Sequence, residues 1–162
     1  MFSPALLSLA RTVLDAAREK KLRIATAESC TGGLIAGLLT EIPGSSDVLE
    51  RGFVTYSNEA KEELLGVPLV LIAKYGAVSE EVARAMAEGA VANSYAQLAI
   101  AVTGIAGPGG GTSLKPVGLV HIAACRKGGS TIHEVHRFGD IGRTEVRLKS
   151  VEAALKLLRR LF

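Results

Sequence analysis

The run Leu98–Val102, with sequence LAIAV, constrains the fold more than any other stretch of this chain. Successive side chains of a strand point to opposite faces of the sheet, so a strand that is apolar at every position must be covered on both faces. We therefore expect Leu98–Val102 to be a central strand with helices packed on either side. It ends at Thr103 and leads into the glycine-rich segment GIAGPGGGTSLKP.

The rest of the chain alternates helical and strand patterns. Ser3 followed by Pro4 is typical of a helix start, and apolar residues then recur at helical spacing. The turn RKGG between two late strands predicts an antiparallel hairpin. The sequence therefore predicts an α/β fold, a three-layer α/β/α sandwich with a mixed β-sheet, formed as a single domain over residues 1–162. Further helices are expected over LIAGLLT, NEAKEELLG, EEVARAMAEGAVANS and from about Arg143 onward, further strands at Leu22–Glu28, Gly118–Cys125, Ser130–Phe138 and ending at Gly52–Ser57, and a short connection at Leu69–Ala77.

Charge and composition exclude several kinds of partner. The net charge is +3, the basic residues are mostly dispersed, and aromatic residues make up 4% of the chain. Few rings are available for base stacking, so we expect no nucleic-acid partner. Cys30 and Cys125 form neither a disulfide framework nor a metal-ligand spacing, which suits a reducing compartment. Without a convincing signal peptide or a membrane-spanning run, we expect a cytoplasmic protein with no membrane partner.

The stretch TAESCTGG places Ser29 and Cys30 at the end of a predicted strand, with Gly32 and Gly33 opening the next helix. This position suits a nucleophile, and it suits equally the wall of a pocket whose chemistry comes from elsewhere. The glycine segment after Thr103 matches neither a Walker loop nor a dinucleotide-binding loop. Its place at the end of a buried strand is nevertheless where α/β folds bind ligands.

Histidine is a weak candidate for the base of a serine or cysteine nucleophile in this chain. His133 and His136 are expected on opposite faces of one strand, which prevents them from sharing a metal, and His121 is expected to stand alone. Lysine can replace histidine as a base when its pKa is lowered. Lys61 lies in the first turn of a predicted helix, where the helix dipole disfavours an ammonium ion. The alternative is a surface lysine beside acidic neighbours.

Arg143 and Arg147 lie one turn apart on one face at the start of the last helix. Two cations at that end oppose the helix dipole, which is reasonable if they hold an anion such as a phosphate or a carboxylate. Pairing with surface carboxylates, such as Glu145 or Asp140, is the alternative.

Several stretches together carry a family resemblance. ESCTGGLIAGLLTEIPGSSDV, GFVTYSNEAKEELLGV, GAVSEEVARAMAEGA, AVTGIAGPGGGTSLKPVG and FGDIGR agree in order and spacing with one family. The chain resembles the CinA C-terminal domain family, whose enzymatic members are nicotinamide mononucleotide deamidases. The resemblance covers nearly all of Leu22–Arg147 and implies a three-layer α/β/α fold with a mixed sheet.

The resemblance implies hydrolysis of the carboxamide of nicotinamide mononucleotide to nicotinic acid mononucleotide and ammonia by a serine and a lysine. Carried over by motif, the nucleophile falls on Ser46, its base on Lys61, and Tyr56 is a nearby hydrogen-bonding residue. It implies a small-molecule nucleotide substrate, no metal or organic cofactor, and a homodimer. Substrate contacts are expected from Ser29, Thr31, Gly32, Gly33, Ser45, Thr103, Gly104 and Arg143.

Two alternatives remain open at the level of the sequence. The first is a catalytically silent nucleotide-binding module that acts through a partner in competence or DNA-damage responses. The second keeps the enzyme but moves the nucleophile from Ser46 to Ser29 or Cys30.

Overall fold

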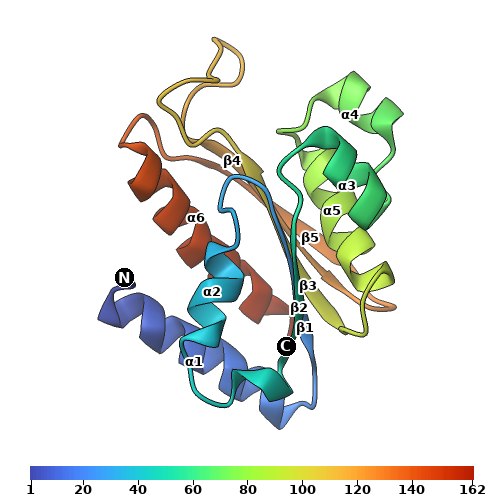
Figure 1. The fold of residues 1–162 in the computed structure, drawn as a ribbon, viewed down its shortest axis with the longest axis vertical. Coiled ribbons are helices and arrows are strands. Elements are labelled where there is room, and N and C mark those ends of the chain that lie inside the picture. Colours follow the sequence, from blue (N-terminus) through green and yellow to red (C-terminus); the bar gives the residue numbers. More distant parts are fainter.

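A mixed sheet of five strands, in the order β2-β1-β3-β4-β5, lies between two layers of helices (Figure 1). The computed structural model describes all residues from Met1 to Phe162. β1, β2 and β3 are parallel, whereas β4 runs antiparallel to β3 and β5 antiparallel to β4. The mixed α/β/α sandwich and the late hairpin are confirmed, and β3 is the central strand that its apolar sequence predicts.

The bounds of the elements are as follows. The strands are β1 Ile24–Glu28, β2 Leu49–Val54, β3 Leu98–Gly104, β4 Leu119–Arg126 and β5 Thr131–Arg137. The helices are α1 Pro4–Glu19, α2 Leu34–Thr40, α3 Asn58–Leu65, α4 Leu69–Tyr75, α5 Glu80–Ala92 and α6 Arg143–Leu158, with short 3-10 turns at Ser45–Asp47 and Arg159–Leu161. None of these helices is both long enough and apolar enough to cross a membrane.

Serine side chains cap three of the helices. The hydroxyls of Ser3, Ser57 and Ser79 accept the backbone N–H of the residue three positions later, at the starts of α1, α3 and α5. Each cap satisfies a donor that the helix itself leaves free. The capped starts of α1 and α5 follow directly from the sequence, and Gly66 ends α3 in the left-handed conformation that favours glycine.

The two faces of the sheet differ in the size of their side chains. The face covered by α1, α2 and α6 carries large residues such as Ile24, Leu98 and Ile100. The opposite face, covered by α3, α4 and α5, carries alanines such as Ala25 and Ala99. Small side chains let a helix approach the sheet closely, and α5 makes that approach.

α4 corrects one expectation. The segment Leu69–Ala77 was expected to be a connection, but residues Leu69–Tyr75 form a helix that begins after Pro68 and ends at Gly76. A seven-residue apolar segment gives too short a pattern for its periodicity to be recognised. The flanking proline and glycine are the signals that mark its ends.

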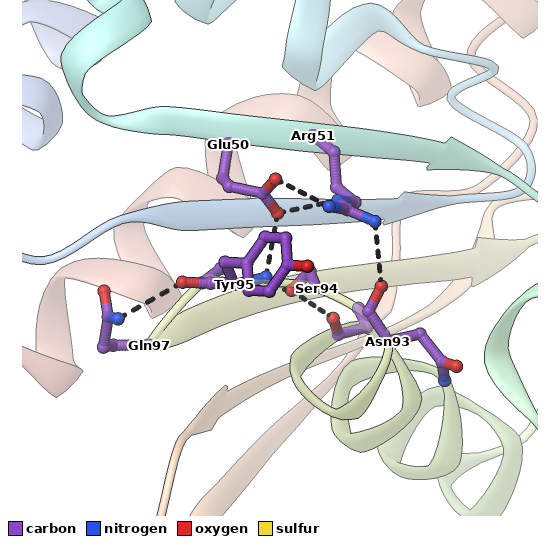
Figure 2. Close-up of polar contacts among 8 residues, drawn as sticks. Glu50, Arg51, Asn93, Ser94, Tyr95 and Gln97 are labelled. Atoms are coloured by element: carbon purple, nitrogen blue, oxygen red, sulfur yellow. Dashed lines mark hydrogen bonds and ion pairs between the residues drawn. The ribbon is translucent and has the colours of Figure 1, made fainter.

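A polar cluster at one end of the sheet ties the edge strand β2 to the turn between α5 and β3 (Figure 2). The Glu50 carboxylate accepts hydrogen bonds from the Arg51 guanidinium, at 2.7 and 2.8 Å, and from the Tyr95 backbone N–H at 3.1 Å. Arg51 also donates to the Asn93 carbonyl at 3.1 Å. These contacts hold β2 in place beside β1.

Candidate active site

The carboxyl ends of the three parallel strands meet at one edge of the sheet, and a pocket of about 270 Å³ opens there. Ligands of open α/β sheets bind at this edge. The residues that follow β1, β2 and β3 converge on the pocket together with the start of α6. Among the predicted site residues, the lining includes Ser29, Tyr56, Lys61, Thr103, Gly104 and Arg143.

Ser29 and Lys61 meet in this pocket. Side chains alternate along β1, so Glu28 points to the α2 face and Ser29, the next residue, to the α3 face. Lys61 reaches the same point from α3, and its Nζ donates to Ser29 Oγ at 3.3 Å. The two residues are 32 positions apart in the chain. A hydroxyl in contact with an amine is the arrangement that an activated serine nucleophile needs.

Lys61 is a buried amine without a carboxylate partner. Its side chain is 1% exposed, and Nζ also donates to the Thr55 and Tyr56 carbonyls at 3.0 and 3.4 Å. Burial lowers the pKa of Lys61 below its ordinary value of 10.5. The surface-lysine alternative is therefore wrong, and Lys61 is suited to accept a proton.

The turn after Ser29 is held by its own backbone and by Glu28. The buried Glu28 carboxylate accepts the N–H groups of Ile35 and Ala36 at 2.9 and 3.1 Å, which caps α2 from the neighbouring strand. Gly32 and Gly33 adopt φ values of +58° and +99°, which side-chain-bearing residues rarely adopt. The chain can therefore reverse direction within five residues of the strand end.

Arg143 closes the opposite rim of the pocket. Its guanidinium donates to the Gly107 carbonyl at 2.8 Å and to the Tyr56 hydroxyl at 3.0 Å, bridging the glycine loop and the end of β2. Gly104, the last residue of β3, leaves no room for a side chain, because a Cβ there would lie 2.7 Å from Val120 Cγ2 on β4. The cation stands at the mouth of the pocket, where an anionic group of a ligand would pass.

Ser46 and Ser45 do not belong to this site, which corrects the pairing of Ser46 with Lys61. Both serines lie in the 3-10 turn that precedes β2, whereas Lys61 follows β2. The six residues of that strand separate the two ends by roughly 20 Å. Ser46 is exposed beside Asp47, whose carboxylate pairs with Arg18 at 2.7 Å. The serine that contacts Lys61 is Ser29.

Three other predicted contacts, Thr31, Gly32 and Gly33, do not line the pocket. Thr31 is fully buried, and Gly32 and Gly33 shape the turn without lining the pocket. Cys30 does line it, and burial raises the pKa of its thiol to about 12, so it is a wall residue and a poor nucleophile. Glu28 is not among the predicted site residues, although an acid at the end of a short strand, directly before a helix start, is a signal visible in the sequence.

His121 and His133 form a cluster of their own, outside the pocket lining, whereas His136 pairs with Glu134. His121 does not stand alone, because its Nδ1 lies 2.9 Å from His133 Nε2, and His133 in turn lies 3.7 Å from a Glu80 oxygen. No group of histidine, cysteine and acidic side chains in the structure is arranged to hold a metal ion. A larger groove of about 460 Å³ between α1 and α6 contains no paired nucleophile and base.

The fold and the site together define an α/β/α protein with a polar pocket at the carboxyl ends of its parallel strands. Residues 6–162 match the family model described as CinA C-terminal domain, and the chain belongs to that family. It is 54% identical over 144 residues to a CinA-like protein of Syntrophus aciditrophicus and 53% identical over 135 residues to one of Akkermansia muciniphila. Those alignments cover 88% and 83% of this chain. They cover 34% and 33% of the relatives, so the chain spans about a third of their length.

Solved structures show the same architecture. The competence/damage inducible protein CihA of Agrobacterium tumefaciens is 53% identical and superimposes with a TM-score of 0.98 over 99% of this chain and 98% of that one. A competence-damaged protein (CinA) superfamily protein of Escherichia coli is 33% identical, with a TM-score of 0.91 over 100% and 94% of the two chains. The three-layer fold is therefore shared at the level of the whole chain.

Proposed function

We propose that this protein is a serine amidohydrolase that converts nicotinamide mononucleotide and water to nicotinic acid mononucleotide and ammonia. The observation that carries the proposal is the contact between Ser29 Oγ and the buried Nζ of Lys61 at 3.3 Å. The family resemblance supplies the substrate, and this contact supports Ser29 rather than Ser46 as the nucleophile. The cytoplasm and a homodimer remain expectations of the same proposal.

In the proposed reaction, neutral Lys61 takes the proton from Ser29 as Oγ attacks the amide carbon. Collapse of the tetrahedral intermediate breaks the carbon–nitrogen bond, and Lys61 returns the proton to the leaving ammonia. A water molecule, deprotonated by Lys61, then attacks the ester on Ser29, releasing the acid and restoring the hydroxyl. The reaction balances with water alone as the second reactant.

The backbone around Ser29 offers a donor for the negative charge of the intermediate. The N–H of Cys30, directly after the nucleophile and in the pocket wall, donates to no acceptor within the protein. A backbone N–H at this position is a common oxyanion donor. Arg143 at the pocket mouth suits the phosphate of the substrate, because a guanidinium matches phosphate oxygens with two donors.

The test measures ammonia released from nicotinamide mononucleotide by the wild-type protein and by two serine variants. We expect Ser29→Ala to lower kcat by roughly three orders of magnitude or more, because the nucleophile is lost. Ser46→Ala is the matched control, and we expect it to stay within about twofold of wild type, as an exposed residue away from the pocket.

Two results would contradict the proposal. Activity that survives Ser29→Ala but not Ser46→Ala would restore the assignment made from the motif. Binding of nicotinamide mononucleotide by the wild type without any ammonia, in an assay where a known deamidase works, would favour the silent nucleotide-binding module.

A further inference from the structure

Arg143 and Arg147 are neighbours on α6 but have different partners. Arg143 is exposed at the pocket mouth, whereas Arg147 is half-buried behind the turn that follows Ser29. Arg147 Nε donates to the Cys30 carbonyl at 3.0 Å, and its Nη2 donates to the Thr31 carbonyl at 3.2 Å. Arg147 forms no ion pair. Its guanidinium binds two backbone carbonyls instead of the phosphate or carboxylate expected from its place at the start of α6.

We infer that Arg147 is a positioning residue that holds the turn Ser29–Gly33 so that Ser29 Oγ stays against Lys61 during the reaction. This inference rests on the proposed function and goes beyond it, because Arg147 does not line the pocket. It acts from the α6 side of the sheet, whereas the nucleophile and the base lie on the α3 side.

Peptide geometry provides the path from Arg147 to Ser29. A trans peptide is planar, so fixing the direction of its C=O also fixes the direction of the N–H on the next residue. The peptide whose carbonyl Arg147 holds at Thr31 carries the N–H of Gly32, and this N–H donates to the Ser29 carbonyl at 3.0 Å. The Ser29 N–H is held in turn by the Val102 carbonyl at 3.0 Å. Arg147 therefore fixes one of the two backbone hydrogen bonds of the nucleophile.

The chemistry of the guanidinium suits this task. Its planar fork directs two donors in fixed directions, here at two successive carbonyls. An ammonium group has no such fork, so a lysine at this position would hold the turn less firmly. Gly32 adds a steric condition, since a Cβ there would lie 3.4 Å from Arg147 Nη2.

The experiment compares Arg147→Met, Arg147→Lys and Arg143→Met by steady-state hydrolysis of nicotinamide mononucleotide. For Arg147→Met we expect kcat to fall roughly 10- to 100-fold with KM within about threefold of wild type, because a displaced nucleophile slows the chemical step without removing a substrate contact. Arg147→Lys should recover part of the loss. Arg143→Met is the contrast on the same helix and should chiefly raise KM.

The outcomes separate this inference from the proposed function. An unchanged kcat in Arg147→Met, or a rise in KM alone, would overturn the positioning role. If Arg147→Met does not fold, Arg147→Lys decides, and an undiminished kcat there would overturn the role as well. A fluorophosphonate probe supplies a second readout, since it labels an activated serine without needing the nucleotide.

The fluorophosphonate readout tests the role of Arg147 even if nicotinamide mononucleotide is not the substrate. If the wild type labels at Ser29 but releases no ammonia, the proposed function fails, and slower labelling of Arg147→Met would still support the inference. Equal labelling rates for the two proteins would overturn it. Neither labelling nor ammonia from the wild type would overturn both.

Discussion

Lys61 has an environment that suits the proposed chemistry and costs stability. The residue is 1% exposed, and its amine contacts the Ser29 hydroxyl and two backbone carbonyls, with no carboxylate to offset the cost of burying a charge. Desolvation disfavours the ammonium form, and this lowers the pKa of Lys61. A scaffold that keeps such a group in place gives up folding free energy at every pH where the group is charged in the unfolded chain.

Lys61→Met should abolish hydrolysis and raise the free energy of unfolding at pH 7 by roughly 1 kcal/mol, because the buried amine is replaced by an apolar side chain of similar length. Since the folded pKa is lowered, the unfolded chain binds the proton more tightly, and wild-type stability should rise with pH between that pKa and 10.5. The difference in the free energy of unfolding between Lys61→Met and wild type should therefore shrink at high pH. Urea unfolding of both proteins at several pH values measures this difference.

The control for this variant is Lys149→Met, since Lys149 is exposed on α6 and forms no ion pair. Its effect should stay within about 0.5 kcal/mol. A Lys61→Met protein that unfolds at lower urea than wild type at pH 7 would show that the hydrogen bonds of the amine outweigh its desolvation.

At the scale of single residues, sequence alone could place Lys61 in the site but not its partner. Two serine-containing motifs, ESC and PGSS, lie before and after α2, and either can supply a nucleophile on chemical grounds. The decision depends on which edge of the sheet each serine lies at: Ser29 follows the carboxyl end of β1, whereas Ser46 precedes the amino end of β2. Only the sheet topology, with parallel strands ending at one edge, makes Ser29 the neighbour of Lys61.

At the scale of elements, a close approach between two helices positions Lys61. α5 packs against α3 at Gly89, where a Cβ would lie 2.0 Å from the Leu65 carbonyl oxygen. Leu65 lies one turn beyond Lys61 on α3. The packing of α5 against α3 and against the alanine-lined face of the sheet therefore sets the depth at which Lys61 enters the pocket.

Gly89→Ala should lower the free energy of unfolding by roughly 1–3 kcal/mol, because the added methyl group cannot be accommodated without moving α3. It should also lower kcat, since Lys61 moves with that helix. Gly37→Ala is the matched control within α2, where an added Cβ meets nothing within 4 Å. That change should be neutral or stabilising by up to about 1 kcal/mol. Urea unfolding midpoints and hydrolysis rates are compared for Gly89→Ala and Gly37→Ala. Equal midpoints would show that the contact of α5 with α3 at Gly89 leaves room for a methyl group.

Helices whose ends are marked by capping residues or by glycine were predictable from the sequence. Elements and contacts that depend on packing against other elements were not. Ser3-Pro4, Ser79 and Gly66 mark helix ends through local hydrogen bonds and backbone conformation, which a sequence displays directly. α4 consists of seven residues and is stabilised by packing against α3 and α5, so its own periodicity is too short to recognise. The contact of His121 with His133 depends likewise on the register of β4 against β5.

At the scale of the whole molecule, the cluster of His121 and His133 makes the free energy of unfolding depend on pH. Burial, more than any neighbouring charge, lowers the pKa of His121 to about 4 and lowers that of His133. Glu80 and Glu81 oppose the shift, whereas Lys115 adds to it at His121. The cluster lies between β4, β5 and α5, so protonating it would place charge inside the packed layers.

Wild-type stability should fall as the pH drops from about 7 to 5, because the unfolded chain takes up a proton near pH 6.5 while folded His121 resists protonation until about pH 4. The loss from this group is on the order of 2 kcal/mol over that range. In His121→Asn the decline should be shallower. Urea unfolding at pH 7, 6 and 5 compares the slopes, and parallel declines for the two proteins would contradict the role of the cluster.

The burial of both cysteines has a practical consequence for studying the molecule. Burial raises the pKa of the Cys30 thiol to about 12 and that of Cys125 above its ordinary value, so neither forms the thiolate that alkylating reagents attack. A thiol introduced by Ser46→Cys would be exposed at the end of β2 opposite the pocket. A fluorophore or a surface tether attached there would report on single molecules while leaving the pocket edge of the sheet open to solution.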